Sequence, residues 1–209
     1  ALPILHYEVG QDGVLAALEQ HVARLSKEGA RFMTLRDLFD TVQAQEARDV
    51  RIPPKSVIVA VSGITSQNLK RVSDALGAIP ATIFIRTGQV GISGISEKQI
   101  LTLQANGFDI QSAGHTGDDL RTLTNAQTQL ELGQSRAILE EMTHKMIFAV
   151  AYPNGGSNDR VMEQAADAGY LFGIGGAPDK NFSREQFLRL PSFTVSSGMT
   201  SEDVLKLTK

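Results

Sequence analysis

The chain has 209 residues, of which 42% are hydrophobic and 21% are charged, and this composition suits one globular domain with a substantial core. The net charge is −3 and the 20 basic residues are scattered, so the sequence predicts no partner among nucleic acids and no anionic membrane surface. No apolar run reaches the roughly 20 residues that cross a bilayer, residues 1–5 are too short for a signal peptide, and the lack of cysteine excludes disulfides and thiolate chemistry.

The first third of the chain combines a short strand, two helices and a buried strand. A strand is predicted at residues 2–7, and a helix at residues 13–28 because apolar side chains recur there at steps of three and four residues. A second helix, residues 34–44, opens with an N-cap threonine and has an acid in its first turn. The polar segment 45–55 ends in two prolines and predicts a loop that leads into a buried strand at residues 57–61.

Strands and helices alternate along the rest of the chain. Further strands are predicted at residues 82–85, 108–112, 147–151, 170–174 and near 187–195. Helices are predicted at residues 67–78, 96–106, 124–142, 158–168 and from Ser201 onward. This alternation indicates parallel βαβ units, and about seven strands favour a closed or nearly closed (β/α) barrel over a half-length doubly wound sheet. In such a barrel the chemistry is expected at the carboxyl ends of the strands.

Six short segments, in order along nearly the whole chain, share a pattern with one known family. They are Leu2–Tyr7, Ala81–Phe84, Gly107–Ser112, Asp119–Thr124, Ala151–Gly155 and Leu188–Pro191. They resemble the polysaccharide deacetylases of carbohydrate esterase family four, which share the NodB homology domain, and most of all the branch that acts on poly-N-acetylglucosamine. The resemblance implies a single domain over residues 1–209 with an α/β fold, a distorted (β/α)7 barrel of the polysaccharide deacetylase type.

The resemblance also implies a metal-dependent hydrolase in the active members of the family. An Asp-Asp pair after the second strand supplies a general base and one ligand of zinc or another divalent metal. A His-x-x-x-His pair after the fourth strand supplies two more ligands. Such a metal keeps open positions for water and for the acetamide oxygen, and the nearby carboxylate deprotonates the water.

In this chain the four positions that carry that chemistry hold other residues. The family pattern places Ser62 at the base position and Gly63 at the first ligand position. It places Ala113 and Gly117 where the two imidazoles belong. Glycine and alanine have no side-chain donor atoms, so these degenerate positions predict neither a metal site nor a metal cofactor.

Two alternatives keep some chemistry at these loops. A register shifted by two residues would pair His115 with Asp119 at the same spacing, but it breaks the match on both sides. Ser62 could be a nucleophile, but the sequence offers no identifiable His or Lys partner and no Gly-x-Ser-x-Gly elbow. We therefore interpret Ser62 as a small polar residue that replaces an acid, and no catalytic residue is assigned.

Three residues are candidates for substrate binding. His115 either touches sugar hydroxyls or is a loop histidine that faces solvent. Tyr152 either stacks on a sugar face or packs at the rim of the strands. Asn154 stands where the family uses a backbone N–H to stabilise the oxyanion, and this donor survives a change of side chain. His6, which follows a Pro-Ile-Leu strand, is expected to be a hydrogen-bonded residue at the carboxyl ends of the strands.

The sequence thus favours a pseudoenzyme, a polysaccharide deacetylase homologue that lacks its metal ligands and base. Its expected partner is a polysaccharide containing N-acetylglucosamine or another protein, in exopolysaccharide or cell-envelope metabolism. Two alternatives stay open: an active carbohydrate deacetylase or esterase with a non-standard metal or catalytic set, and a structural interaction domain without sugar affinity. By resemblance the protein is expected to be exported to the periplasm or cell envelope, although this chain carries no signal peptide.

Overall fold

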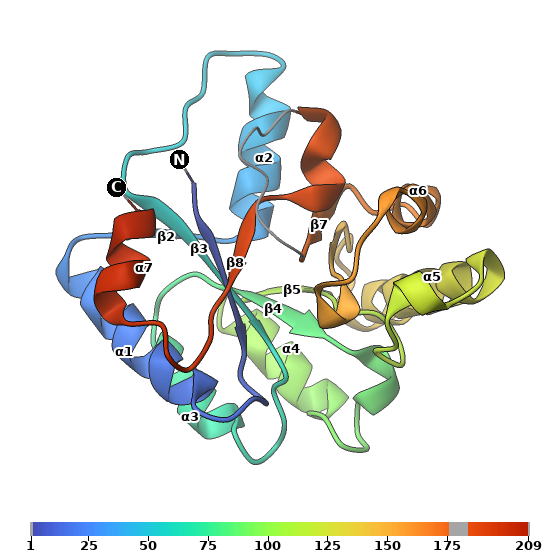
Figure 1. The fold of residues 1–209 in the computed structure, drawn as a ribbon, viewed down its shortest axis with the longest axis horizontal. Coiled ribbons are helices and arrows are strands. Elements are labelled where there is room, and N and C mark those ends of the chain that lie inside the picture. The colour runs from blue at the N-terminus through green and yellow to red at the C-terminus, as the bar shows by residue number, and fades with distance from the viewer. Residues whose placement is uncertain (1, 176–183, 209) are drawn as a thin grey trace. The chain divides into compact units, whose positions relative to one another are not determined.

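A computed structural model describes residues 2–175 and 184–208 of the chain, which form an α/β fold (Figure 1). The described residues form eight strands: β1 (Ile4–Glu8), β2 (Arg31–Met33), β3 (Ser56–Ser62), β4 (Thr82–Ile85), β5 (Asp109–Ser112), β6 (Ala149–Ala151), β7 (Phe172–Ile174) and β8 (Ser192–Thr194). The α-helices of the described residues are α1 (Val14–Lys27), α2 (Leu35–Gln45), α3 (Leu69–Leu76), α4 (Glu97–Ala105), α5 (Asn125–Thr143), α6 (Asp159–Asp167) and α7 (Ser201–Leu207).

The strand order is β7-β6-β5-β4-β3-β1-β8, and β2 pairs with β3 in addition. The strand pairs β1–β3, β2–β3, β3–β4, β5–β6 and β6–β7 are all parallel. Parallel neighbours require a crossover between them, and the helices predicted by the apolar periodicity supply it. The prediction of parallel βαβ units is therefore confirmed.

By its internal contacts the chain divides into two compact units. Unit 1 consists of Ala1–Ile83, Gly107–Asp109 and Thr194–Lys209, and unit 2 of Phe84–Asn106 and Ile110–Phe193. Each unit has its own buried residues, so each is described by itself. A single domain over residues 1–209 stays a prediction.

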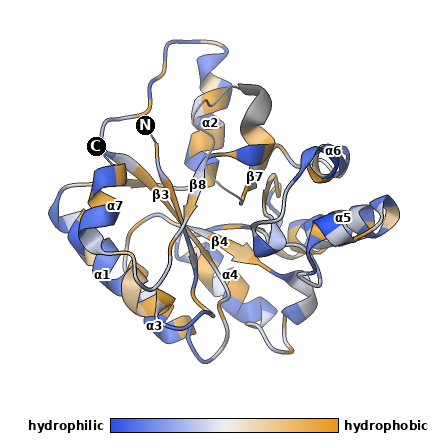
Figure 2. Ribbon diagram, viewed as in Figure 1, coloured by the Kyte–Doolittle hydropathy of each residue, from blue (hydrophilic) through white to orange (hydrophobic). Residues whose placement is uncertain are grey.

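The core of unit 1 is built on β3, in which all seven residues are buried. Figure 2 shows this strand as mainly hydrophobic, the pattern of a parallel strand covered on both faces. Helix α1 packs against α3 and α7, and its buried side chains include Leu18, Val22 and Leu25. Their spacing of three and four residues places them on one face of the helix.

The core of unit 2 lies between its strands and the helices α5 and α6, which pack on each other. The rings of Phe148 and Phe172 meet edge to face at 5.6 Å. The fully buried Gln111 accepts hydrogen bonds from the backbone N–H groups of Phe148 and Ala149, each at 3.0 Å. This side chain satisfies two buried donors that would otherwise be costly to leave unpaired.

Two sequence predictions fail in detail. Strand β2 was not predicted, because three residues are too few to show a period, yet Phe32 pairs with Val57 in the ladder to β3. Residues 187–189, predicted as strand, belong to the 3-10 helix Arg184–Arg189. The strand begins only at Ser192, after Pro191, which has no N–H to donate to a ladder.

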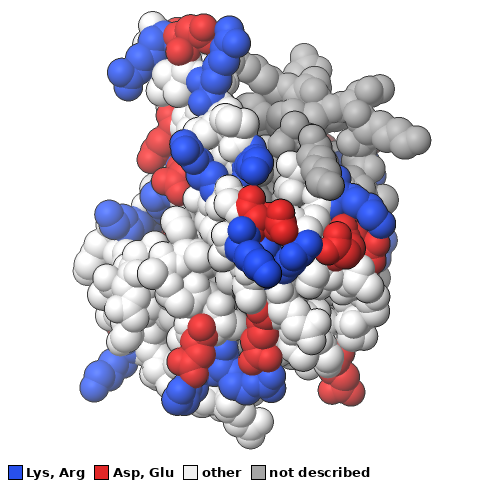
Figure 3. All heavy atoms as spheres, turned by 90° about the vertical axis from the view of Figure 1, so that its left-hand side faces the viewer, with Lys and Arg blue, Asp and Glu red and all other residues white. Residues whose placement is uncertain are grey.

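Two surface features bear on partners. On the face shown in Figure 3, acidic and basic side chains are interleaved, which agrees with the scattered charge of the sequence. Within residues 2–175 and 184–208, no helix is long and apolar enough to cross a membrane.

Candidate functional site

The carboxyl ends of β1 and β3 bring three polar side chains of unit 1 together. His6 lies opposite Ala60 in the parallel ladder, and Glu8 lies opposite Ser62. Because alternate residues of a strand point to the same side, His6 and Glu8 share one side of β1. The His6 Nε2 atom is hydrogen-bonded to the Ser62 Oγ atom, and the Ser62 carbonyl accepts a bond from the Val9 N–H at 2.9 Å.

The contact between His6 and Ser62 corrects one expectation and confirms another. The expectation that Ser62 has no histidine partner is wrong, because the pair is separated by 56 residues in sequence and only the strand register brings it together. His6 is a hydrogen-bonded residue at a strand end, as predicted. Burial lowers the pKa of His6 to about 4, so its imidazole is neutral at pH 7 and can accept a proton.

Gly63, the first degenerate ligand position, adopts a backbone conformation that disfavours side chains. Its φ is 78°, in the left-handed region that glycine occupies without steric cost. A Cβ atom added there would overlap the carboxylate of Glu8 and lie 2.8 Å from the backbone nitrogen of Gly10. The Glu8 carboxylate therefore fills the space in which an aspartate at this position would begin.

The loop that follows β5 in unit 2 carries the two other degenerate ligand positions. Ala113 is buried, and its N–H donates to the Ile85 carbonyl at 2.8 Å. The loop is joined to residues after β4 by two backbone hydrogen bonds, from Thr87 N–H to the Gly114 carbonyl at 3.1 Å and from Gly88 N–H to the His115 carbonyl at 2.9 Å. These bonds hold the loop in one conformation.

Gly117, the position of the second missing imidazole, is covered by an arginine. Its φ is 90°, and a Cβ atom added there would overlap the guanidinium group of Arg86. This side chain from the end of β4 brings a positive charge to a position at which the family pattern has a metal ligand.

His115 is held from both its ring and its backbone. Its Nδ1 atom is 2.9 Å from the Thr87 Oγ1 atom. The carboxylate of the buried Glu131, on α5, accepts from the backbone N–H groups of His115 and Thr116 at 3.1 and 2.9 Å. Sequence reasoning gave Glu131 no role at this loop, although it is an acid on an otherwise buried face of a predicted helix.

The alternative register would use His115 and Asp119 as a ligand pair. Asp119 instead accepts hydrogen bonds from Arg121, from Nε at 2.9 Å and from the backbone N–H at 3.0 Å. The side-chain bond from Arg121 lowers the pKa of Asp119. Since His115 is also bonded to Thr87, both candidate ligands already have partners in the protein.

The two other candidate substrate-binding residues lie after β6. Tyr152 is buried, at 2% exposure, and its hydroxyl donates to the Leu188 carbonyl at 2.8 Å. Asn154 is exposed and has a left-handed backbone with φ of 56°. Tyr152 thus packs in this structure, and stacking on a sugar would first require its ring to be uncovered. The binding roles of His115, Tyr152 and Asn154 stay predictions.

The residues present do not fit the divalent metal that the fold family implies. Gly63, Ala113 and Gly117 offer no side-chain donor. Across the two described stretches, no group of three or more His, Asp or Glu side chains is arranged to hold a metal ion. We therefore derive no step of chemistry through a metal at these positions.

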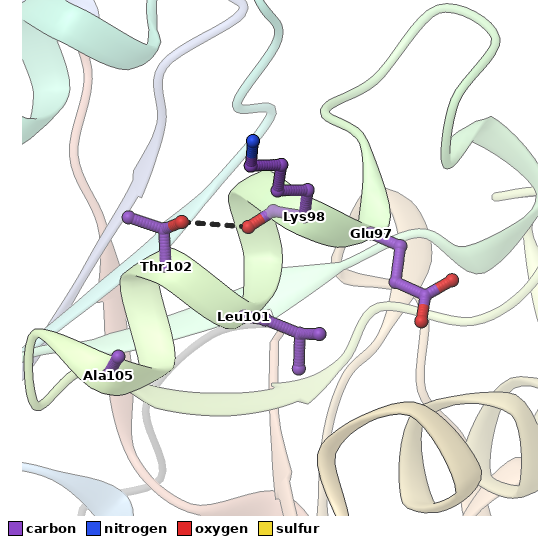
Figure 4. A pocket seen from close by; sticks show the side chains of 5 residues that line it. All are labelled: Glu97, Lys98, Leu101, Thr102 and Ala105. Carbon is purple, nitrogen blue, oxygen red and sulfur yellow. Dashed lines mark hydrogen bonds between the residues drawn. The ribbon is translucent and has the colours of Figure 1, made fainter.

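A hollow lies on the surface of α4 (Figure 4). It is lined by Glu97, Lys98, Leu101, Thr102 and Ala105. All five come from one helix, and the Thr102 hydroxyl is bonded to the Lys98 carbonyl at 2.8 Å. This shallow surface brings no groups together from different elements, so it is not a candidate site.

Acidification is expected to destabilise the fold through its buried histidines. Burial lowers the pKa values of His6, to about 4, and of His21. Between pH 6.5 and 4 the unfolded chain therefore binds more protons than the folded one. The free energy of unfolding consequently decreases as the pH is lowered through this range. For His6 alone we expect a loss of about 2 kcal/mol between pH 7.5 and 4.5, measured by urea unfolding.

The variant His6→Gln is expected to flatten this pH dependence. The matched control is His144→Gln, because the His144 ring is exposed and its replacement removes no buried group. Equal slopes for His6→Gln and the wild-type chain would contradict the assignment.

A family model and a relative from Bacillus subtilis match this chain. The family model described as polysaccharide deacetylase matches residues 53–173. The protein YxkH of Bacillus subtilis (strain 168), which is named as a polysaccharide deacetylase, is 25% identical over 95% of this chain and 73% of its own length.

Two solved structures have the same fold. One is the Streptococcus pyogenes deacetylase PplD in complex with acetate, with a TM-score of 0.84 and 19% identity over 100% of this chain and 98% of that one. The other is a polysaccharide deacetylase from Bacillus cereus, with a TM-score of 0.82 and 20% identity over 100% of this chain and 69% of that one. The predicted (β/α)7 barrel fold class is thereby confirmed. Because the family model spans more than half of the sequence, the chain belongs to the polysaccharide deacetylase family.

Proposed function

We propose that this family member has lost metal-dependent deacetylation and acts as a binding protein for a glycan that contains N-acetylglucosamine, or for a protein partner, in exopolysaccharide or cell-envelope metabolism. The observation that carries the proposal is Gly63. Its left-handed backbone and the Glu8 carboxylate beside it leave no space for a ligand side chain. The backbone conformation at this position therefore disfavours a ligand, in addition to the lack of a side chain.

The other degenerate positions support the same proposal. A glycine at position 117 lies under the guanidinium of Arg86, and a fixed positive charge disfavours a second cation nearby. Ser62 is hydrogen-bonded to His6, and a hydroxyl is a far weaker base than the carboxylate it replaces. The features at positions 117 and 62 both reduce the ability of this protein to generate a metal-bound hydroxide.

One contact favours a second candidate function, an esterase that uses different residues. A serine hydroxyl bonded to the Nε2 atom of a neutral histidine is the arrangement of a nucleophile and its general base. The low pKa of His6 makes it a weak base, which reduces the expected rate. The esterase is therefore the less favoured of the two candidate functions.

Three measurements separate these functions: metal content, acetate release and turnover of an activated ester. We expect no metal at stoichiometric levels by inductively coupled plasma analysis, and no acetate release from N-acetylglucosamine oligomers with added zinc, cobalt or nickel. Stoichiometric metal together with chelator-sensitive turnover would overturn the proposal. Turnover of 4-nitrophenyl acetate that resists chelator and is lost in Ser62→Ala, but not in the exposed control Ser66→Ala, would establish the esterase instead.

Binding is tested by calorimetric titration with chitin and poly-N-acetylglucosamine oligomers. A glycan-binding member gives a saturable signal. A structural interaction domain gives none with any oligomer, and that outcome would leave a protein partner as the remaining function of this fold.

A further inference from the structure

Arg86, in unit 2, has no role in the metal-dependent deacetylation of the family. It directly follows β4, and its guanidinium lies so close to Gly117 that a Cβ atom there would overlap its Nε, Cζ and Cδ atoms. Only glycine at position 117 leaves room for the guanidinium in this place. The structure thus has a fixed cationic side chain at the position of a missing imidazole.

Arg86 has no acceptor in the part of the chain that the structure describes. Its Nε atom is buried and makes no hydrogen bond there, and none of the ion pairs among those residues includes it. By contrast, Arg121 and Arg136 of the same unit are paired with Asp119 and Glu140. Arg86 as a whole is half-buried, but a buried donor atom without an acceptor is costly, and such atoms in native proteins call for an explanation.

The surroundings of Arg86 are held in place. Thr87 and Gly88, the next residues, are bonded to the carbonyls of Gly114 and His115. Glu131 holds the same loop from α5 through the His115 and Thr116 N–H groups. The backbone around Arg86 is therefore held in place, and only the side chain of Arg86 has to be ordered when it binds a ligand.

The chemistry of the group points to an anion. A guanidinium is planar, always charged, and presents N–H donors in a fork that matches a carboxylate or a sulfate. The net charge of the chain is −3, so the attraction must come from this local group. We propose that Arg86 binds the anionic substituent, a carboxylate or a sulfate, of an acidic glycan; this inference rests on the proposed glycan binding and names its class of ligand.

Calorimetric titration of the full chain tests this assignment with three hexamers: a hyaluronan hexamer, in which glucuronate alternates with N-acetylglucosamine, a 6-O-sulfated N-acetylglucosamine hexamer, and the unmodified N-acetylglucosamine hexamer. We expect one of the two acidic hexamers to bind, and which one it is separates carboxylate from sulfate. Arg86→Gln should weaken its binding at least 10-fold, and Arg86→Lys, which keeps the charge without the fork, should weaken it less. The control Arg121→Gln removes an exposed arginine from a neighbouring loop and should leave binding unchanged.

Thermal unfolding distinguishes a binding role from a structural one. If Arg86 lacks a partner, Arg86→Met should keep or raise the melting temperature of the wild-type chain, whereas loss of a structural arginine would lower it. The inference is overturned if neither acidic hexamer binds, if Arg121→Gln weakens binding as much as Arg86→Gln, or if polyglutamate binds as well as the sugar. Binding of N-acetylglucosamine hexamer alone, unaffected at Arg86, would overturn this inference and leave the proposed function intact.

Discussion

The variant Gly63→Asp, which restores the ligand residue of the active family pattern, is expected to lower the melting temperature by about 10 °C. A non-glycine residue in the left-handed region costs about 1–2 kcal/mol, and its side chain would also overlap the Glu8 carboxylate. Together these effects amount to about 3 kcal/mol, which shifts the melting temperature of a chain of this size by roughly that amount. Differential scanning calorimetry measures it.

Alanine variants separate the free-energy cost of the left-handed backbone from the cost of steric overlap with neighbouring atoms. Gly29 has a φ of 73°, close to the 78° of Gly63, but no atom lies within 4 Å of a Cβ added there. Gly29→Ala therefore measures the backbone cost alone, about 1 kcal/mol, and Gly63→Ala should cost clearly more. In a double-mutant cycle with Glu8→Ala, the part of the excess that comes from the Glu8 carboxylate should disappear, whereas the close contact with the Gly10 backbone nitrogen remains.

The outcome at Gly63 decides whether the structure around this position still accepts a ligand side chain. If Gly63→Asp kept the wild-type melting temperature, the side chain would be accommodated there, and the interpretation of Gly63 would be wrong. If it is destabilised, Glu8 and the backbone have adapted to the glycine. Restoration of the chemistry would then require changes at Glu8 as well as at the four degenerate positions.

Most of the fold could be predicted from local patterns. Helix α1 lies within one residue of the predicted range at each end, and the strand at residues 82–85 coincides with β4, because apolar periodicity and capping residues act within a few residues of each other. Strand β2 was missed because its evidence is its pairing with β3, more than 20 residues away. A three-residue strand has no periodicity of its own.

The candidate site was harder to predict, because its contacts join distant segments. The family pattern located Ser62 and Gly63, but the register of β1 against β3 is what places His6 at Ser62 and the Glu8 carboxylate at Gly63. A paired-strand argument, with the apolar residues of both strands aligned, could have suggested the first contact. Nothing local in the sequence indicates that Arg86 lies over Gly117.

Replacement of Glu131 by methionine is expected to destabilise the loop after β5 more than any other single change there. The carboxylate is buried, at 8% exposure, and one of its oxygens accepts from the N–H groups of both His115 and Thr116. Methionine has a similar shape but no comparable acceptor, so two donors lose their partner at a cost of about 3 kcal/mol. Urea unfolding measures the loss, and faster amide hydrogen exchange at residues 115 and 116 locates it.

Glu131→Gln is the matched control, because its amide oxygen can accept the same two hydrogen bonds. We expect it to cost less than about 1 kcal/mol and to leave both amides protected from exchange. Equal losses for the two variants would show that the charge of Glu131, rather than its oxygen, stabilises the loop. If Glu131→Met also weakens binding of the acidic hexamer, the ordered loop is part of what holds Arg86 ready for its ligand, because Glu131 holds the backbone of residues 115 and 116 and would act on the guanidinium through this loop.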